Sequence, residues 1–206
     1  NAVAPGEITK KYGADILRLW AASVDYQADC SMSEEILKQI SENYRKVRNT
    51  FRFLLANINN EDDFTKADLV DVSELPKLDQ YMLALLDEVN AKCQLAYQEY
   101  RFSDVTTLLT NLMTNEFSAY YLDFTKDILY IEKKDSPRRR QVQTVLYHAV
   151  NVLVRLWAPI LVHTAEEVND FFKGEEESIH LGRFAEPFNI TDAEALKAKV
   201  GRLMQI

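Results

Sequence analysis

The sequence predicts an all-α protein built as a helical bundle. Glycine and proline are scarce, with five of each among 206 residues, and a shortage of both favours helices over a turn-rich β fold. Apolar residues recur at helical spacing in several long segments, which short polar segments separate. Four long helical segments in succession are typical of a bundle. We therefore expect a helical bundle preceded by a short helical connecting module.

Residues 1–32 are predicted to form this connecting module from two short helices. Pro5 opens the first helix and Gly13 ends it, because proline suits the first helical position and glycine the position after the last turn. In the second helix Asp15 and Arg18 stand three residues apart, which predicts a local ion pair. The apolar face of the second helix is formed by Ile16, Leu19 and Trp20.

Residues 33–187 are predicted to form the bundle. Ser33 is placed to cap the first long helix, Ser103 the third, and Ser136 with Pro137 opens the fourth. The predicted long helices cover residues 33–58, 78–100, 103–130 and 136–157. The predicted core includes Trp20, Phe51, Leu54, Tyr81, Leu85, Leu112, Leu146, Leu153 and Trp157.

Shorter elements complete the chain. Thr164, followed three residues later by Glu167, matches a capping box that begins a short helix ending near Phe172. Residues 179–181 are predicted to be a short extended piece. Residues 188–206 are predicted to start a carboxyl-terminal extension, with a last helix over 191–204.

The formal net charge of −8 argues against a general polyanion binder, whose surface would be broadly basic. Residues 38–52 and 133–140 nevertheless carry five bases and one acid each, so local contact with RNA is compatible with the composition. Residues 150–162 form the most apolar stretch, which is too short and too polar to span a bilayer. Cys30 and Cys93 have no disulfide or metal spacing, so we expect a cytoplasmic protein without a membrane partner.

The first long helix carries the main candidate binding residues. Arg45, Arg48, Asn49 and Arg52 recur at helical spacing on a face other than the apolar one, and Lys46 lies beside them. At 1.5 Å per residue, Arg45 and Arg52 lie about 10 Å apart, wide enough to meet two neighbouring phosphates. The alternative is a solvated face with intrahelical ion pairs to Glu42, or a face on which Asn49 and Arg52 brace the bundle.

The second candidate is the run Arg138, Arg139 and Arg140 in the first turn of the fourth helix. Cations at this position oppose the helix dipole, so something should compensate them. We expect one or two of these arginines to pair internally, with Asp123 or Asp127, and the remainder to contact RNA.

Motifs for catalysis are missing from the sequence. It contains neither a glycine-rich phosphate loop nor a nucleophile elbow. A di-iron bundle needs two Glu-x-x-His motifs, and the one match, Glu177-Ser178-Ile179-His180, falls in a predicted loop. We therefore predict neither catalytic residues nor metal ligands in this chain.

Several of these segments match motifs of one protein family. They are Tyr12-Gly13-Ala14-Asp15 followed by Leu17-Arg18, the string Tyr44-Arg45-Lys46-Val47-Arg48-Asn49-Thr50-Phe51-Arg52-Phe53, the string Tyr120–Asp127, and Pro159–Glu167. In this order they resemble class I aminoacyl-tRNA synthetases, and Trp20 with Asp25-Tyr26…Asp29 is similar to the isoleucyl enzymes. Members of the family usually place tryptophan two residues after the last glutamate, where this chain has Asn169.

The resemblance covers roughly residues 1–187 and implies the anticodon-binding domain, in a fragment that begins just after the catalytic lysine loop. It implies a parent enzyme that uses ATP with magnesium to attach isoleucine to its tRNA, with zinc in a carboxyl-terminal module of many relatives. The fragment is expected to bind tRNA as a monomer, without a cofactor, and to be inactive alone. Two alternatives stay open: a helical scaffold that docks another protein, and the equivalent domain of a valyl- or leucyl-tRNA synthetase.

Overall fold

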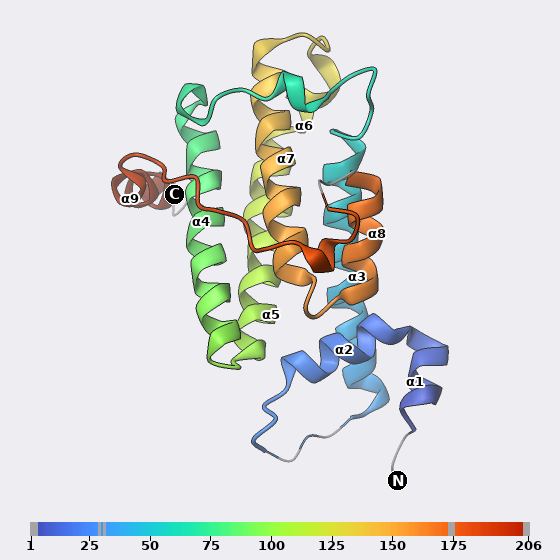
Figure 1. Cartoon of the computed structure of the whole chain (residues 1–206). Helices are drawn as coiled ribbons and strands as arrows, with labels where there is room; N and C mark the ends of the chain where they lie inside the picture. Colours follow the sequence, from blue (N-terminus) through green and yellow to red (C-terminus); the bar gives the residue numbers. More distant parts are fainter. Residues whose placement is uncertain (1–3, 29, 31, 173–175, 204–206) are drawn as a thin grey trace.

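A computed structural model of the chain describes residues 4–28, 30, 32–172 and 176–203 and is helical throughout its regular parts (Figure 1). Within these residues the structure contains no strand, so the predicted all-α class is confirmed. None of the described helices is both long and apolar enough to cross a membrane. The helices are α1 (Pro5–Tyr12), α2 (Ala14–Ser23), α3 (Glu34–Ala56), α4 (Lys77–Gln98), α5 (Phe102–Asn111), α6 (Asp123–Ile131), α7 (Pro137–Trp157), α8 (Val162–Phe172) and α9 (Ala193–Leu203).

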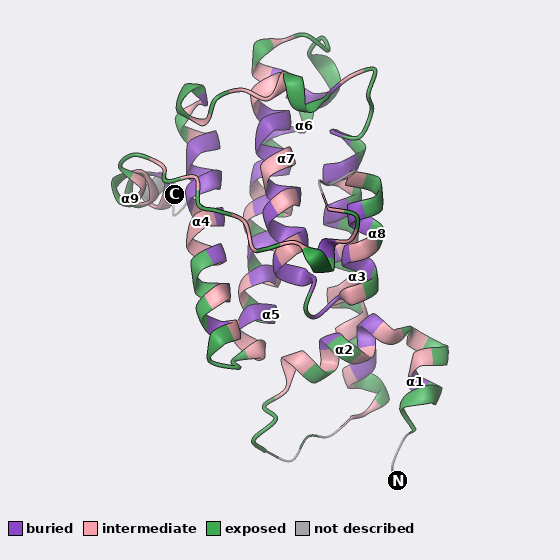
Figure 2. Cartoon of the chain, viewed as in Figure 1, coloured by how far each residue is buried: buried purple, intermediate pink, exposed green. Residues whose placement is uncertain are grey.

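The long helices pack around α7, which lies between α4 and the pair α3 and α8, while α1 and α2 lie at one end of the bundle (Figure 1). Along α7 nearly every turn is buried on two or more sides, and Trp157 at its end is fully enclosed (Figure 2). Leu19 of α2 belongs to the same apolar core as the long helices. The connecting module therefore packs on the bundle rather than standing apart from it.

Seven of the nine predicted core residues are buried, and the other two, Trp20 and Leu85, are only half-buried. At each of these two positions a neighbouring leucine takes the inward place: Leu19 in α2 and Leu86 in α4. Successive residues are rotated by about 100° around a helix, and here Leu19 and Leu86 face the core more directly than Trp20 and Leu85 do. The prediction was wrong for these two by one helical position.

The helix predicted from Ser103 begins one residue earlier, at Phe102, so Ser103 is not its cap. It continues without a break through residue 131, and its middle part, η3 (Leu112–Leu122), is a π-helix. A π-helix is wider than an α-helix and has i to i+5 hydrogen bonds; it is rare and is frequently found at functional sites. No local pattern in the sequence predicts this π-helical segment.

The first and fourth long helices begin where the sequence predicts. The Ser33 hydroxyl accepts the backbone N–H of Ile36 at 3.2 Å, so it caps α3. Ser136 precedes α7 with Pro137 at the first helical position, although the Ser136 hydroxyl donates to Glu132 and does not cap the helix.

Two predictions about the connecting module and α8 were wrong. α8 begins at Val162, so Thr164 lies inside the helix and does not cap it. Asp15 and Arg18 do not pair with each other; the Asp15 carboxylate accepts from Thr164, and the Arg18 guanidinium donates to the carbonyls of Pro159 and Ile160. Both side chains have found partners outside their own helix.

After α8 the chain returns across the bundle as a strap that reaches α9 beside α4 (Figure 1). Residues 179–181 form a 3-10 helix rather than the predicted extended piece, because the Ser178 hydroxyl accepts the N–H of His180 and starts a helical turn. Asn169, where the resembling family usually has tryptophan, is buried, and its amide donates to the Glu176 carbonyl at 3.3 Å. The polar residue thus ties α8 to the strap.

Candidate nucleic-acid interface

The outer side of α3 carries the predicted basic residues as a ridge. Arg45 and Arg52 are exposed two helical turns apart, and neither makes a hydrogen bond or an ion pair with any other described residue. The pairing with Glu42 that the sequence allowed is not observed. The two guanidinium groups are therefore available to an outside ligand.

Arg48 lies on one flank of this ridge, and its guanidinium meets the Glu167 carboxylate of α8 at 3.4 Å. Both side chains are about half exposed, 44% for Arg48 and 52% for Glu167. An exposed pair of this kind contributes at most about 1 kcal/mol. Arg48 is therefore only weakly held by the protein itself.

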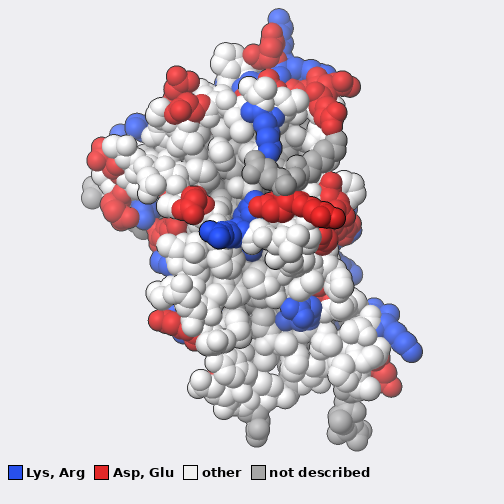
Figure 3. All heavy atoms as spheres, viewed as in Figure 1, with Lys and Arg blue, Asp and Glu red and all other residues white. Residues whose placement is uncertain are grey.

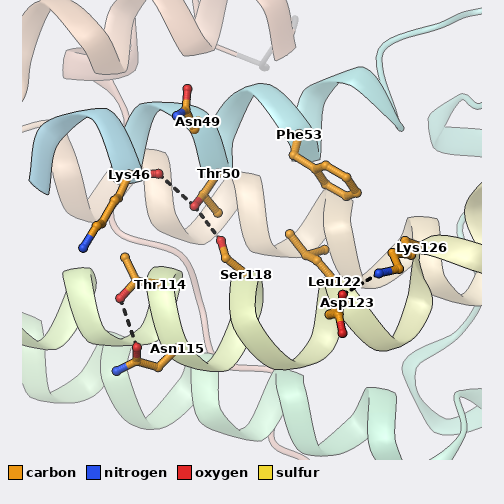
Figure 4. Close-up of a pocket in the computed structure, with 10 residues that line it drawn as sticks. All are labelled: Lys46, Asn49, Thr50, Phe53, Thr114, Asn115, Ser118, Leu122, Asp123 and Lys126. Carbon is orange, nitrogen blue, oxygen red and sulfur yellow. Dashed lines mark hydrogen bonds and ion pairs between the residues drawn. The ribbon is translucent and has the colours of Figure 1, made fainter. Parts of the chain in front are cut away.

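Lys46 and Asn49 lie on the opposite flank, where they line a groove between α3 and η3 (Figure 4). The groove has a volume of about 570 Å³. It is lined by amide, hydroxyl and charged side chains together with two apolar ones: Lys46, Asn49, Thr50, Phe53, Thr114, Asn115, Ser118, Leu122, Asp123 and Lys126. A second hollow along the α3–α5 seam shares Lys46, Thr114 and Asn115 with it.

A hydroxyl pair forms the floor of the groove and joins its two walls (Figure 4). The Thr50 hydroxyl donates to the Lys46 carbonyl at 3.0 Å. Since that hydroxyl has a single hydrogen, it accepts from Ser118, 2.8 Å away on η3. The floor is thus fixed, while the Asn49 amide on the rim keeps its donors and acceptor for a ligand.

An aromatic pair and an ion pair lie at the α6 end of the groove. Phe53 meets Tyr130 edge to face with ring centroids 6.4 Å apart, and Tyr130 is largely exposed. Lys126 donates to Asp123 at 2.6 Å (Figure 4), and this contact raises the pKa of Lys126, so its positive charge is secure at neutral pH.

The groove residues of η3 were missed from the sequence. Hydroxyl side chains recur every four residues along the two hollows, at Thr106 and Thr110 of α5 and at Thr114 and Ser118 of η3. In the π-helix, with more than four residues per turn, this spacing keeps Thr114 and Ser118 on the side that faces α3. The four-residue repeat was visible in the sequence, but its direction depends on the π-helix, which was not.

The three arginines at the start of α7 all face carboxylates of the protein. Arg139 donates to Asp63 at 2.6 Å, and this guanidinium lowers the pKa of the Asp63 carboxyl. Arg140 lies near Asp63 and Asp68, at 3.6 and 3.8 Å. The expected internal pairing thus extends to every arginine of the run, while the expected partners, Asp123 and Asp127, were wrong.

Arg138 pairs with the most enclosed of these carboxylates. Its guanidinium meets Asp79 of α4, whose side chain has no exposed surface, and the Tyr121 hydroxyl donates to the same carboxylate at 2.9 Å. Burial and the neighbouring Asp79 charge raise the pKa of Tyr121 well above its usual value, so it stays a donor. This network is built into the core, and its geometry favours a structural role for Arg138.

One other face of the molecule offers fewer binding features. On the face seen in Figure 3, acidic and basic side chains are interspersed and form no continuous basic area. The described residues also contain no group of three or more histidines, cysteines or acids placed to hold a metal ion. The ridge of α3 and the adjoining groove are thus the best candidate site.

Comparison with known proteins identifies the fold. Residues 79–206 match the family model described as the anticodon-binding domain of tRNA ligase. The chain belongs to this family. The matched part contains η3, α6 and α7, and therefore one wall of the groove.

The relatives of this anticodon-binding domain are isoleucine–tRNA ligases. The chain is 49% identical over 209 residues to the isoleucine–tRNA ligase of Geobacillus kaustophilus (strain HTA426). It is 48% identical over 207 residues to the ligase of Listeria monocytogenes serotype 4b (strain F2365), and 47% identical over 207 residues to the ligase of Bacillus subtilis (strain 168). Each match covers 100% of this chain and 22% of the relative. The chain thus spans about a fifth of the length of these ligases.

Proposed function

We propose that this chain is the tRNA-binding part of an isoleucine–tRNA ligase and binds the anticodon arm of the isoleucine tRNA. The observation that carries the proposal is the pair Arg45 and Arg52, exposed and unpaired among the described residues, on the same helix as the groove residues Lys46 and Asn49. Guanidinium groups bind phosphate with two parallel hydrogen bonds. The family membership and the relatives' names support the same assignment.

In the proposed site, charged side chains bind the phosphates, and hydrogen-bonding side chains meet the bases. Arg45, Arg52 and the weakly held Arg48 contact phosphates, which position the RNA without reading its sequence. Lys46 and Asn49 face the groove, where unpaired bases can be met by an amide and hydroxyls. Residues 138–140 retain at most a minor part in RNA contact, because each is engaged with an aspartate.

In the full-length enzyme, this domain works beside a catalytic part that uses ATP and magnesium to activate isoleucine. We propose that the domain itself needs no cofactor, acts within a monomeric cytoplasmic enzyme, and performs no chemistry alone. The proposed boundaries are a connecting module at 1–32, the anticodon-binding bundle at 33–187, and the start of a carboxyl-terminal extension at 188–206. Zinc, where relatives use it, belongs to a module beyond this chain.

A titration of the chain with purified tRNAs at two salt concentrations tests the proposal. Contacts with two or three phosphates of a single-stranded loop predict that affinity falls about tenfold between roughly 50 and 200 mM salt. Isoleucine tRNA is expected to bind at least as well as valine or leucine tRNA. A protein-docking scaffold would bind none of the three, and that result would overturn the proposal. Stronger binding of valine or leucine tRNA would assign the domain to that synthetase instead.

A further inference from the structure

A carboxylate from the connecting module caps a helix of the bundle. Asp15 of α2 is buried and accepts the backbone N–H groups of Thr164 at 2.7 Å and His163 at 3.3 Å. These N–H groups lie in the first turn of α8, where no carbonyl of the helix itself can reach them. A negative charge at this end also interacts favourably with the helix dipole. Asp15 therefore caps α8, a role that a residue directly before the helix usually has.

Arg18, one helical turn after Asp15 in α2, binds the segment that leads from α7 into α8. Its Nε donates to the Ile160 carbonyl and one terminal nitrogen to the Pro159 carbonyl, both at 2.9 Å. These carbonyls directly follow α7, and cations are favoured at a helix C-terminus. Asp15 and Arg18 thus form hydrogen bonds with both ends of the turn between α7 and α8.

Thr164 extends this contact to a third helix. Its buried hydroxyl donates to Asp15 at 2.6 Å, so it accepts from the Tyr44 hydroxyl of α3, 3.0 Å away. α3 is the helix that carries the basic ridge. One hydrogen-bonded cluster therefore connects the module, the helix that carries the proposed RNA contacts, and the start of α8.

We propose that Asp15 and Arg18 are positioning residues that fix the angle between the connecting module and the bundle. This inference rests on the proposed function: tRNA held on α3 must also reach the active site of the remaining enzyme. Apart from this cluster, the module is held by apolar contacts through Leu19, which have no preferred direction, by one long contact of 3.5 Å between the Ser23 and Thr106 hydroxyls, and by the exposed pair Lys11–Glu34. Hydrogen bonds constrain angles as well as distances, so the cluster sets the orientation.

The effect on the reaction follows from geometry. A misplacement of reacting groups by about 1 Å, caused far from the chemistry, can lower the rate about 100-fold. Activation of isoleucine needs no tRNA, whereas transfer to tRNA needs the acceptor end in place. Loosening the cluster should therefore slow transfer and leave activation and tRNA binding intact.

The kinetic test uses the Geobacillus kaustophilus ligase with this chain in place of its matching segment. Arg18→Ala is the main variant, because Arg18 is exposed and its loss leaves no buried charge. We expect kcat for aminoacylation to fall about tenfold or more, with KM for tRNA and isoleucine-dependent pyrophosphate exchange within twofold. Asp15→Asn should show the same pattern, and Lys11→Ala, which removes the exposed pair of the same module, should show none of it. Unchanged aminoacylation in Arg18→Ala would overturn the proposal, as would an equal loss in all three quantities.

A distance measurement tests the inference without tRNA. Spin labels at Lys10→Cys in α1 and Lys92→Cys in α4, with Cys30→Ser removing the exposed thiol, report the angle of the module on the bundle. We expect one narrow distance distribution, which Arg18→Ala broadens and Lys11→Ala does not. An unchanged distribution in Arg18→Ala would refute the positioning role even if the chain binds tRNA. Failure of the unmodified chain to bind tRNA would refute the proposed function and leave this result standing.

Discussion

Replacing Asp79 by alanine is expected to lower the free energy of unfolding by roughly 3–5 kcal/mol, the usual cost of removing one partner of a buried ion pair. The Asp79 side chain has no exposed surface and is the acceptor for both the Arg138 guanidinium and the Tyr121 hydroxyl. Without it, the buried Tyr121 hydroxyl and the part-buried Arg138 guanidinium lose their acceptor. Urea denaturation followed by circular dichroism measures the change.

Asp123→Ala provides the matched control for this variant. Asp123 also pairs with a cation, Lys126, but its side chain is 66% exposed. Such a surface pair contributes about 1 kcal/mol or less, so the unfolding midpoint should hardly move. Equal destabilisation by the two variants would show that the Asp79 network is not enclosed as described.

Leu153→Ala should lower the free energy of unfolding by roughly 2–5 kcal/mol, because a fully buried leucine leaves a cavity when it is shortened. Leu153 lies in α7, against which α3, α4, α6 and α8 all pack, and has no exposed surface. The same denaturation experiment measures this change.

Leu181→Ala makes the same substitution at the surface, since the Leu181 side chain is 74% exposed. A surface change of this kind is expected to stay within about 0.5 kcal/mol. Comparable effects at the two leucines would contradict the central position of α7 in the bundle.

Local signals in the sequence were sufficient to predict most of the fold. The buried stripe of α3 was visible because Val47, Phe51 and Leu54 repeat at helical spacing, and its start because Ser33 is a good cap. Predictions failed where a structural feature depends on a partner residue far away in the sequence. The cap of α8 comes from Asp15, about 150 residues earlier, and no local pattern around Thr164 could show it.

The candidate site was predictable in part for the same reason. Helical spacing placed Arg45 and Arg52 together on an outer face, because that requires only the geometry of one helix. The groove beside them also needs the wall formed by η3, and therefore the π-helix and the packing of η3 on α3. The internal pairing of residues 138–140 followed from the helix dipole, whereas the identity of their partners depended on the path of the loop that contains Asp63.

The salt dependence of tRNA binding to the double variant Arg45→Gln/Arg52→Gln tests the central claim most directly. Each phosphate contact to a single strand contributes about 0.7 to the slope of log affinity against log salt, so this variant should bind more weakly, with a slope smaller by about 1.4. Lys92→Gln/Arg101→Gln removes the same charge from α4 and the α4–α5 turn, where both cations already pair with acids, and should leave the slope unchanged. A folded Arg45→Gln/Arg52→Gln variant with unchanged affinity and slope would contradict the account and reduce this face of α3 to a solvated surface.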